Sequence, residues 1–309
     1  MGRFKEQKHE MNYSPLRYPG GKNKLSAFVA KICIDNEVSG HYVEPYCGGA
    51  AVALFVLMEG FVKKITINDK DRSIYAFWFS VINHTEHLCN LIENAELSIT
   101  EWRRQKQIQS DKKNTNLLEL GFSTFYLNRT NRSGIINAGV IGGINQNGNY
   151  LMDCRFNKEN LIERIRKIAD KKKQIKLYNL DAIKLINKIE KNKLKKNTVF
   201  YFDPPYYLKA SSLYMNHYES SNHKLVSDRI KSIDGIKWIV SYDNVPEIQT
   251  LYSECVKKEF SFKHTAYEIR EGKEVLFMSN DIKEPEIKDW NPLRFKLKRG
   301  KTTANIVYK

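Results

Sequence analysis

The clearest pattern along the chain is a series of short apolar runs separated by longer mixed segments. Residues 199–202 are continuously apolar, and they are rich in β-branched and aromatic side chains, which is typical of a strand buried on both faces of a parallel sheet. Pro204 cannot donate to the hydrogen-bonding ladder, so this strand should end at Asp203. Further strands are predicted at residues 41–45, 64–69, 175–181 and 238–243, with antiparallel strands at 260–265 and 274–279.

Helices are predicted in most of the segments between these strands. The predicted ranges are 24–34, 51–59, 71–83, 157–173, 223–234 and 246–255. Strands that alternate with helices in this way predict an α/β fold with a mainly parallel sheet. Ligands of such open sheets bind at the carboxyl ends of the strands, which makes Asp203 a candidate site residue.

The four residues Asp203-Pro204-Pro205-Tyr206 suit chemistry on an exocyclic amino group. The Asp203 carboxylate can accept one N–H, and the rigid Pro204 carbonyl can accept the other. The ring of Tyr206 offers a flat face on which a base could stack. The alternative is that this segment is only a rigid turn that ends a strand.

Two glycine-containing segments near the amino terminus are candidates for ligand binding. In the first, at residues 16–22, adjacent glycines precede Lys22, whose ammonium can meet a carboxylate or a phosphate; a simple turn with a solvated lysine is the alternative. The second, at 44–49, links a strand to a helix through a tight turn, as in nucleoside-binding units. Asp69 ends the next strand, where a carboxylate suits a ribose diol, although it could instead cap a helix.

The character of the chain changes between residues 84 and 170. This region is polar and charged, and a long loop rich in glycine and asparagine follows the segment 122–134. Arginine and asparagine side chains hold phosphates and read base edges, so Asn128, Arg129, Asn131 and Arg132 are predicted to contact DNA. We interpret 84–170 as an inserted, mainly helical target-recognition domain, with an ordinary helical insertion as the alternative.

Composition and charge favour a nucleic-acid partner. The net charge is +16, which favours a polyanion, although a basic surface can also serve solubility alone. Apolar residues make up 41% of the chain, which is enough for a sizeable core. The five cysteines are scattered and lack metal-ligand spacing, so we expect no zinc site, no disulfide framework and a reducing cytoplasm. No signal peptide or membrane span is expected.

Three motifs together resemble a known family, the Dam-like, alpha-class DNA adenine-N6 methyltransferases. These motifs are Leu16-Arg17-Tyr18-Pro19-Gly20-Gly21-Lys22, Glu44-Pro45-Tyr46-Cys47-Gly48-Gly49 and Asp203-Pro204-Pro205-Tyr206. Their order matches the class, in which the cofactor motifs precede the recognition region and the catalytic motif follows it. The resemblance covers most of residues 14–282.

The resemblance implies a Rossmann-like class I methyltransferase sheet, S-adenosylmethionine as the cofactor, and double-stranded DNA as the substrate. It implies that adenine is flipped from the duplex and that residues 208–222 could form a flap over it. The catalytic residues would be Asp203, Pro204, Pro205 and Tyr206. The cofactor-binding residues would be Tyr18, Lys22, Glu44, Tyr46, Gly48, Gly49, Asp69, Asp181 and Asp203, of which Asp181 could equally be a helix cap. The family's usual glycine at position 50 is alanine here, which should crowd the ligand slightly.

We therefore expect a discontinuous catalytic domain at 1–83 and 171–283, the recognition domain at 84–170, and a basic tail at 284–309 whose charges contact phosphate or are simply solvated. We expect a cytoplasmic enzyme of bacterial or phage origin that acts as a monomer and binds neither a metal nor a membrane. A restriction endonuclease of the same system is a candidate partner. Cytosine-N4 methylation, RNA methylation and a catalytically idle DNA-binding module are the alternatives. Asp203 in place of serine, with this motif order, favours adenine in DNA.

Overall fold

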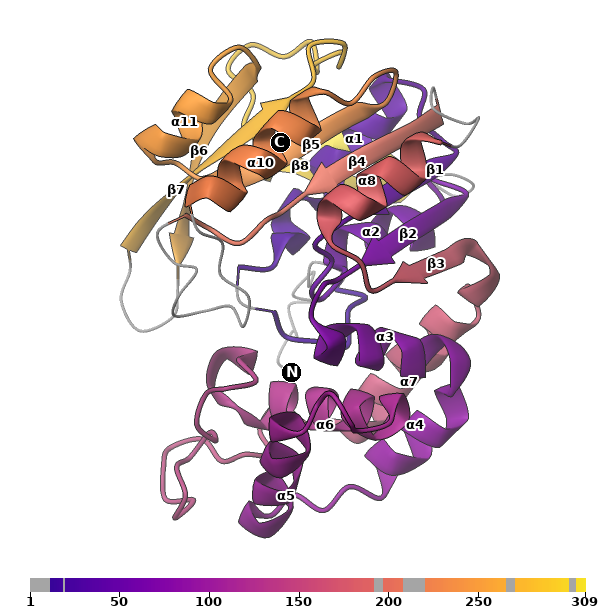
Figure 1. Ribbon diagram of the computed structural model, residues 1–309, viewed down its shortest axis with the longest axis vertical. Coiled ribbons are helices and arrows are strands. Elements are labelled where there is room, and N and C mark those ends of the chain that lie inside the picture. The colour runs from indigo at the N-terminus through magenta and orange to yellow at the C-terminus, as the bar shows by residue number, and fades with distance from the viewer. Residues whose placement is uncertain (1–11, 19, 192–196, 208–219, 265–269, 300–303) are drawn as a thin grey trace, which may run out of the picture.

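The computed structural model of the protein describes residues 12–18, 20–191, 197–207, 220–264, 270–299 and 304–309. Within them, a seven-stranded sheet carries helices on both faces, and a helical lobe lies beside one edge region of that sheet (Figure 1). Most of the predicted flap, residues 208–219, lies outside the described residues.

The sheet confirms the predicted α/β fold with a mainly parallel sheet. Its strands run in the order β3-β2-β1-β4-β5-β7-β6, in which β1 to β5 are parallel to one another and β7 is antiparallel to both β5 and β6. Their bounds are β1 His41–Glu44, β2 Lys64–Asn68, β3 Ile175–Tyr178, β4 Thr198–Phe202, β5 Lys237–Asp243, β6 Val256–His264 and β7 Arg270–Met278.

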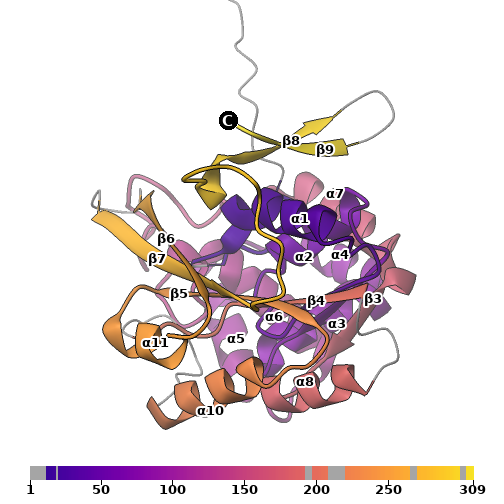
Figure 2. The ribbon, with the colours of Figure 1, turned by 90° about the horizontal axis from the view of Figure 1, so that it is seen from above.

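Helices cover both faces of this sheet because alternate side chains of each buried strand point to opposite faces. In β4, Phe200 and Phe202 belong to the core beneath α8, α10 and α11, whereas Tyr201 belongs to the core beneath α1 and α2. Figure 2 shows these two helical layers on either side of the sheet. Their bounds are α1 Ser26–Asp35, α2 Ala51–Met58, α8 Ala182–Glu190, α10 Ser220–Lys231 and α11 Pro246–Leu251.

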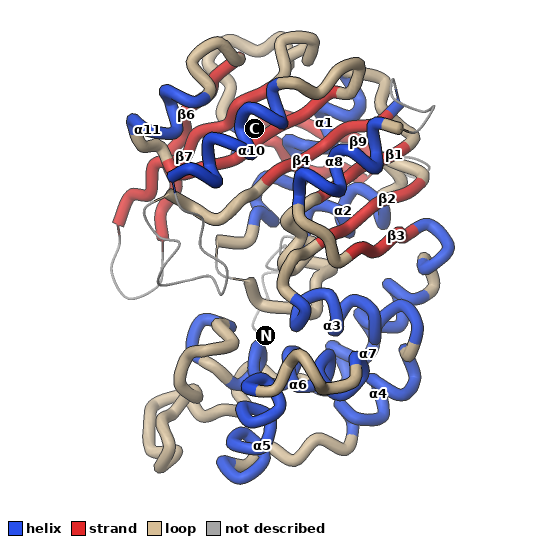
Figure 3. Tube along the Cα trace, in the orientation of Figure 1, coloured by secondary structure: helices blue, strands red, loops and turns tan. Residues whose placement is uncertain are grey.

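The helical lobe is inserted between β2 and β3, and Figure 3 shows that its described part consists of helices and loops. Its helices are α3 Arg72–Asn83, α4 Thr85–Glu93, α5 Ile99–Ser110, α6 Leu117–Thr130 and α7 Lys158–Ala169. The insertion was predicted to be mainly helical, but the sequence pattern indicated no helix at the positions of α4, α5 and α6 within it, nor at that of α8 in the sheet domain. The predicted boundary at residue 84 separates α3 from helices that it packs against, since the rings of Phe77 and Phe125 stack 5.9 Å apart.

Close contact between α3 and α6 depends on a glycine in α6. A Cβ atom on Gly121 would lie 2.4 Å from Ser80 Oγ and 2.5 Å from the Ala76 carbonyl oxygen. These distances are far shorter than ordinary van der Waals contacts, so a larger residue would force the two helices apart. Gly121 therefore sets the spacing between the lobe and the helix that leads into it.

The segment predicted as a basic tail contains a folded hairpin in its described part. Strands β8 (Phe295–Arg299) and β9 (Ala304–Tyr308) pair antiparallel. Phe28 of α1 holds the hairpin in place, because its ring stacks on Trp290 at 5.0 Å and lies 5.8 Å from Phe295. Sequence reasoning missed this element because the apolar positions are few and lie among lysines and arginines.

Candidate active site

A cavity of about 610 Å³ lies where the carboxyl ends of the central strands face the helical lobe. Its two walls differ in charge. The sheet side contributes four acidic residues, and the lobe with its adjoining amino-terminal segment contributes three arginines. The acids are Glu44, Asp69, Asp71 and Asp203, and the arginines are Arg17, Arg129 and Arg164. Lys22 and Lys70 also line the cavity, but Lys22 pairs with Asp203 and Lys70 with Asp181.

The two predicted glycine motifs meet at this cavity. The Tyr18 ring lies against the turn after β1, where a Cβ atom on Gly48 would be 2.6 Å from the ring. Gly48 also has a φ of +42°, so both its backbone and its surroundings require glycine. Tyr18, Tyr46 and Gly49 line the cavity, whereas Gly48 supports the turn from behind.

The alanine at position 50 adopts a left-handed backbone at the start of α2, with φ +49° and ψ +32°. A glycine would adopt this conformation without steric cost, which gives a structural reason why glycine is usual at this position. Ala50 is among the residues that line the cavity, and it is 1% exposed; crowding of a ligand by its methyl group stays a prediction.

Two acids of the sheet wall are held by backbone N–H groups. Asp69 accepts from the N–H of Gly48 at 3.0 Å and from that of Asp71 at 2.9 Å. Burial, reinforced by Asp71, raises the pKa of the Asp69 carboxyl to about 7. Glu44 accepts from the N–H of Ala53 at 3.1 Å, and burial together with Asp203 raises its pKa well above the usual range.

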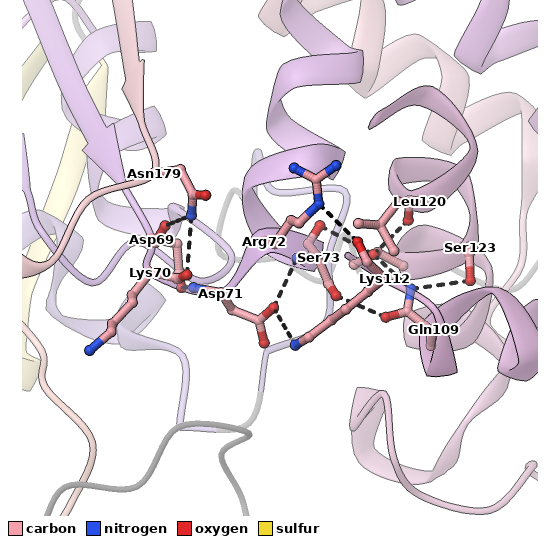
Figure 4. Close-up of polar contacts among 11 residues, drawn as sticks. Asp69, Lys70, Asp71, Arg72, Ser73, Gln109, Lys112, Leu120, Ser123 and Asn179 are labelled. Carbon is pink, nitrogen blue, oxygen red and sulfur yellow. Dashed lines mark hydrogen bonds and ion pairs between the residues drawn. The ribbon is translucent and has the colours of Figure 1, made fainter. Parts of the chain in front are cut away.

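Figure 4 shows how this wall connects to the lobe. The Asp71 carboxylate caps α3 through the N–H of Ser73 and pairs with Lys112 of the lobe at 3.2 Å. The Ser73 hydroxyl in turn donates to Gln109, whose amide nitrogen donates to Ser123 of α6 at 3.1 Å. The strand end that carries Asp69 is thus tied to α5 and α6 by polar contacts.

Asp203 sits at the carboxyl end of β4, as the sequence predicts, and lines the cavity. Its Oδ1 atom accepts from Ser241 Oγ at 2.8 Å and pairs with Lys22 Nζ at 3.0 Å. Lys22 Nζ also donates to Tyr206 OH at 2.6 Å, so the first glycine motif is bound directly to the catalytic motif. Sequence reasoning missed Ser241 because it lies within the apolar run of β5.

Tyr206 and Pro204 stand behind the cavity and do not line it, whereas Pro205 does. The Tyr206 side chain is 7% exposed, and Lys22 Nζ lies 4.7 Å from the centre of its ring. Its hydroxyl donates to Glu274 of β7, a residue that sequence reasoning also missed. Stacking of a base on Tyr206 stays a prediction.

Asp181, predicted with the cofactor residues, caps α8 through the N–H of Ile183 at 3.0 Å. It pairs with Lys70 at 3.3 Å and does not line the cavity. Asp181 therefore occupies a helix-cap position, which was the alternative interpretation from the sequence. A role in cofactor binding stays a prediction.

Of the four predicted DNA-binding residues, two are buried and form hydrogen bonds with neighbouring segments of the protein. Asn128 is 1% exposed and bonds both the N–H and the carbonyl of Arg17, and Asn131 is 0% exposed and accepts from the indole of Trp102. Their contacts support an indirect role, in which they hold the loops that carry other residues. Arg132 is exposed and does not line the cavity.

Arg129 lines the cavity and is 9% exposed. It donates to the Pro15 carbonyl, and no acid in the described part of the chain pairs with it. Burial and the neighbouring Arg164 and Arg17 lower its pKa to about 9, so it remains charged at neutral pH. Arg17 adds a buried Nη1 atom that has no hydrogen-bond partner among the described residues. This wall is therefore suited to an anion.

Within the described ranges, no group of three or more histidine, cysteine, aspartate or glutamate side chains is arranged to hold a metal ion. None of the described helices is both long and apolar enough to cross a membrane.

The comparisons with known proteins point to one family. The model of the D12 class N6 adenine-specific DNA methyltransferases matches residues 18–269. No curated protein gives a match. Among solved structures, a Pyrococcus horikoshii protein described as a candidate RNA methyltransferase is similar, with 9% sequence identity and a TM-score of 0.37 over 85% of this chain and 84% of that one.

Proposed function

The chain belongs to the D12 class N6 adenine-specific DNA methyltransferases, and from this premise we propose that it uses S-adenosylmethionine to methylate adenine N6 at a specific site in double-stranded DNA, after flipping the base out of the duplex. One observation carries the proposal: Asp203 lies in a single cavity with an acidic wall on the sheet side and a basic wall on the lobe side.

The residues of the acidic wall fit S-adenosylmethionine. A cavity of about 610 Å³ has the size of a typical small-molecule site. Asp69 ends β2, where its carboxylate can accept from a ribose diol, and Tyr18 offers an aromatic face beside the glycine turn. Asp203 provides negative potential for a ligand that carries a sulfonium, and the Glu44 carboxyl group lines the same wall. When bound, the cofactor supplies an electrophilic methyl group.

The residues of the basic wall fit the DNA backbone. Three guanidinium groups gather there, and each phosphate that they approach would release counterions. Arg164 of α7 donates to the Ser14 carbonyl at 3.2 Å, and no carboxylate among the described residues forms an ion pair with it. The arginines line the same cavity as Asp203, so DNA bound to them could deliver a flipped base into that cavity.

The chemistry of the chain itself is mainly positioning. Asp203 Oδ1 is engaged by Ser241 and Lys22, which leaves Oδ2 to accept one N–H of the adenine amino group. The Pro204 carbonyl can accept the other N–H, so that the nitrogen lone pair is directed along the line of transfer. The proton that the nitrogen loses can pass to Oδ2 or to water.

The experiment is to incubate the protein with duplex DNA and isotopically labelled S-adenosylmethionine, and then to digest the DNA to nucleosides. We expect label in N6-methyladenine and none in N4-methylcytosine. Methylation-sensitive sequencing of DNA from an expressing host should show one recurring site. Label in cytosine, label in RNA alone, or no transfer would contradict the proposal.

A further inference from the structure

Behind Asp203 lies a second carboxylate that the predicted mechanism does not use. Glu274 projects from β7, is 4% exposed, and is paired in register with Asp243 of β5. Its Oε1 atom accepts the hydroxyl hydrogen of Tyr206 and lies 3.5 Å from Lys22 Nζ. It also lies outside residues 18–269, which the family model covers.

Lys22 is shared between the two carboxylates. Its Nζ atom is 3.0 Å from Asp203 Oδ1 and 3.5 Å from Glu274 Oε1, and it also donates to the Gly20 carbonyl at 2.9 Å. The side chains of Lys22 and Glu274 are each 6% exposed, so water screens their charges poorly. Asp203 and Lys22 alone would form a neutral pair, whereas the three groups together carry one net negative charge.

This charge matters for the reaction proposed above. The adenine amino nitrogen becomes more positive as it gains a methyl group, and a neutral Asp203–Lys22 pair would do little to stabilise that change. An ammonium close to Asp203 would even oppose it. A second carboxylate on the far side of Lys22 both restores the negative potential and draws the ammonium away from the substrate.

We propose that Glu274 is a positioning residue for methyl transfer, which shares Lys22 with Asp203 and thereby keeps the Asp203 carboxylate effectively negative towards the adenine amino group. The proposal rests on the proposed function for its effect on catalysis. The charge sharing itself can be measured without cofactor or DNA.

The surroundings support a role for the charge and not only for the hydrogen bond to Tyr206. A neutral glutamine could accept that hydrogen bond equally well, whereas a buried carboxylate is costly unless it has a charged partner. Two further acids face this cluster: Glu44 interacts electrostatically with Asp203, and Asp243 lies opposite Glu274 in the pairing of β5 with β7. Burial raises the pKa of Glu274, while Lys22 and Tyr206 oppose the rise.

Glu274→Gln separates charge from hydrogen bonding, because it keeps an oxygen acceptor and loses the negative charge. We expect single-turnover methyl transfer to fall about 10- to 100-fold at pH 8. Cofactor affinity, DNA affinity and the fluorescence of 2-aminopurine at the target position, which reports base flipping, should stay within about threefold of wild type. Tyr206→Phe removes the hydrogen bond and keeps the charge, so its transfer rate should fall less than that of Glu274→Gln.

A matched control is available on the neighbouring strand. Glu259 of β6 pairs with Lys257 at 2.9 Å, but its side chain is 48% exposed. Glu259→Gln removes the same charge from a solvated ion pair, and we expect transfer to be unchanged. If both glutamine variants lost activity equally, a general charge effect would replace the proposed one.

The second readout is the pKa of Lys22 in the cofactor-free protein, followed by NMR of labelled lysine side chains and assigned with Lys22→Arg. Loss of one anionic partner should lower this pKa by about one unit in Glu274→Gln and leave it unchanged in Glu259→Gln. An unchanged Lys22 pKa, or transfer by Glu274→Gln within twofold of wild type, would overturn the proposal. A wild-type protein that does not methylate adenine would instead overturn the proposed function.

Discussion

The two walls of the cavity achieve opposite charges by different structural means. On the sheet wall, Asp69 and Asp203 stand at strand ends, and neighbouring donors hold their carboxylates. On the lobe wall, Arg129 and Arg164 come from α6 and α7 and donate to backbone carbonyls of the segment 14–15. The acids are thus oriented at the strand ends, while the two arginines donate to backbone carbonyls and have no carboxylate partner among the described residues.

Under the proposed function, one cavity serves two ligands of opposite charge. Acids at the strand ends suit a small cationic cofactor, which needs exact placement by a rigid sheet. Arginines on helices suit a polyanion, which needs charge over a longer distance. Substitutions on the sheet wall should therefore change methyl transfer or cofactor binding, whereas substitutions on the lobe wall should change DNA binding and its salt dependence. The following experiments test that separation.

The largest effect is expected for Asp203→Ala. Methyl transfer should fall by about 100-fold or more, because even a small misplacement of the reacting nitrogen costs about two orders of magnitude. Binding of cofactor and of DNA should stay within about tenfold, as measured by calorimetry and by titration of labelled duplex. A near-normal single-turnover rate would remove Asp203 from the mechanism.

Gly121→Ala tests the close packing of α3 and α6, which supports the lobe wall. The added methyl group would meet Ser80 and the Ala76 carbonyl, and such overpacking destabilises proteins by about 1–3 kcal/mol. We expect a lower melting temperature. Gly139→Ala is the control, because a Cβ atom there meets nothing within 4 Å. Equal melting temperatures for the two variants would show that α3 and α6 can separate freely.

Cofactor binding at the sheet wall should depend on pH through Asp69. A ribose diol binds the ionised form of Asp69, whose pKa is raised to about 7, so cofactor affinity should fall as the pH drops below 7, by up to about tenfold per unit. Asp69→Asn should bind more weakly and without this dependence. Isothermal titration at several pH values measures both, and a flat wild-type profile would contradict the assignment.

The smallest effect is expected on the lobe wall. Arg164→Ala should weaken DNA binding several-fold and reduce the slope of log affinity against log salt by about 0.9, if one phosphate contact is lost. Arg166→Ala is the matched control, because Arg166 lies on the same helix, pairs with Glu86 at 2.7 Å and does not line the cavity. If both variants change the salt slope alike, the basic wall is not a distinct surface.

Much of the sheet wall was predictable from sequence because its geometry is local. An apolar run that ends in an acid and a proline places Asp203 at a strand end whatever surrounds it. The same holds for the strand that leads to Asp69 and for the glycine turn after β1. The motif order and the net charge of +16 then indicated the class of reaction and of partner.

The tertiary structure alone decided which distant residues complete the site. Ser241 and Glu274 lie in strands whose sequences look like ordinary core, and only the pairing of β5 with β4 and β7 brings them to Asp203 and Lys22. In the lobe, packing buried Asn131 and left Arg164 facing the cavity, although both are polar residues in polar segments. Periodicity assigns a residue to a face of its own element, but contacts between distant elements depend on how those elements pack, and this cannot be read from local pattern.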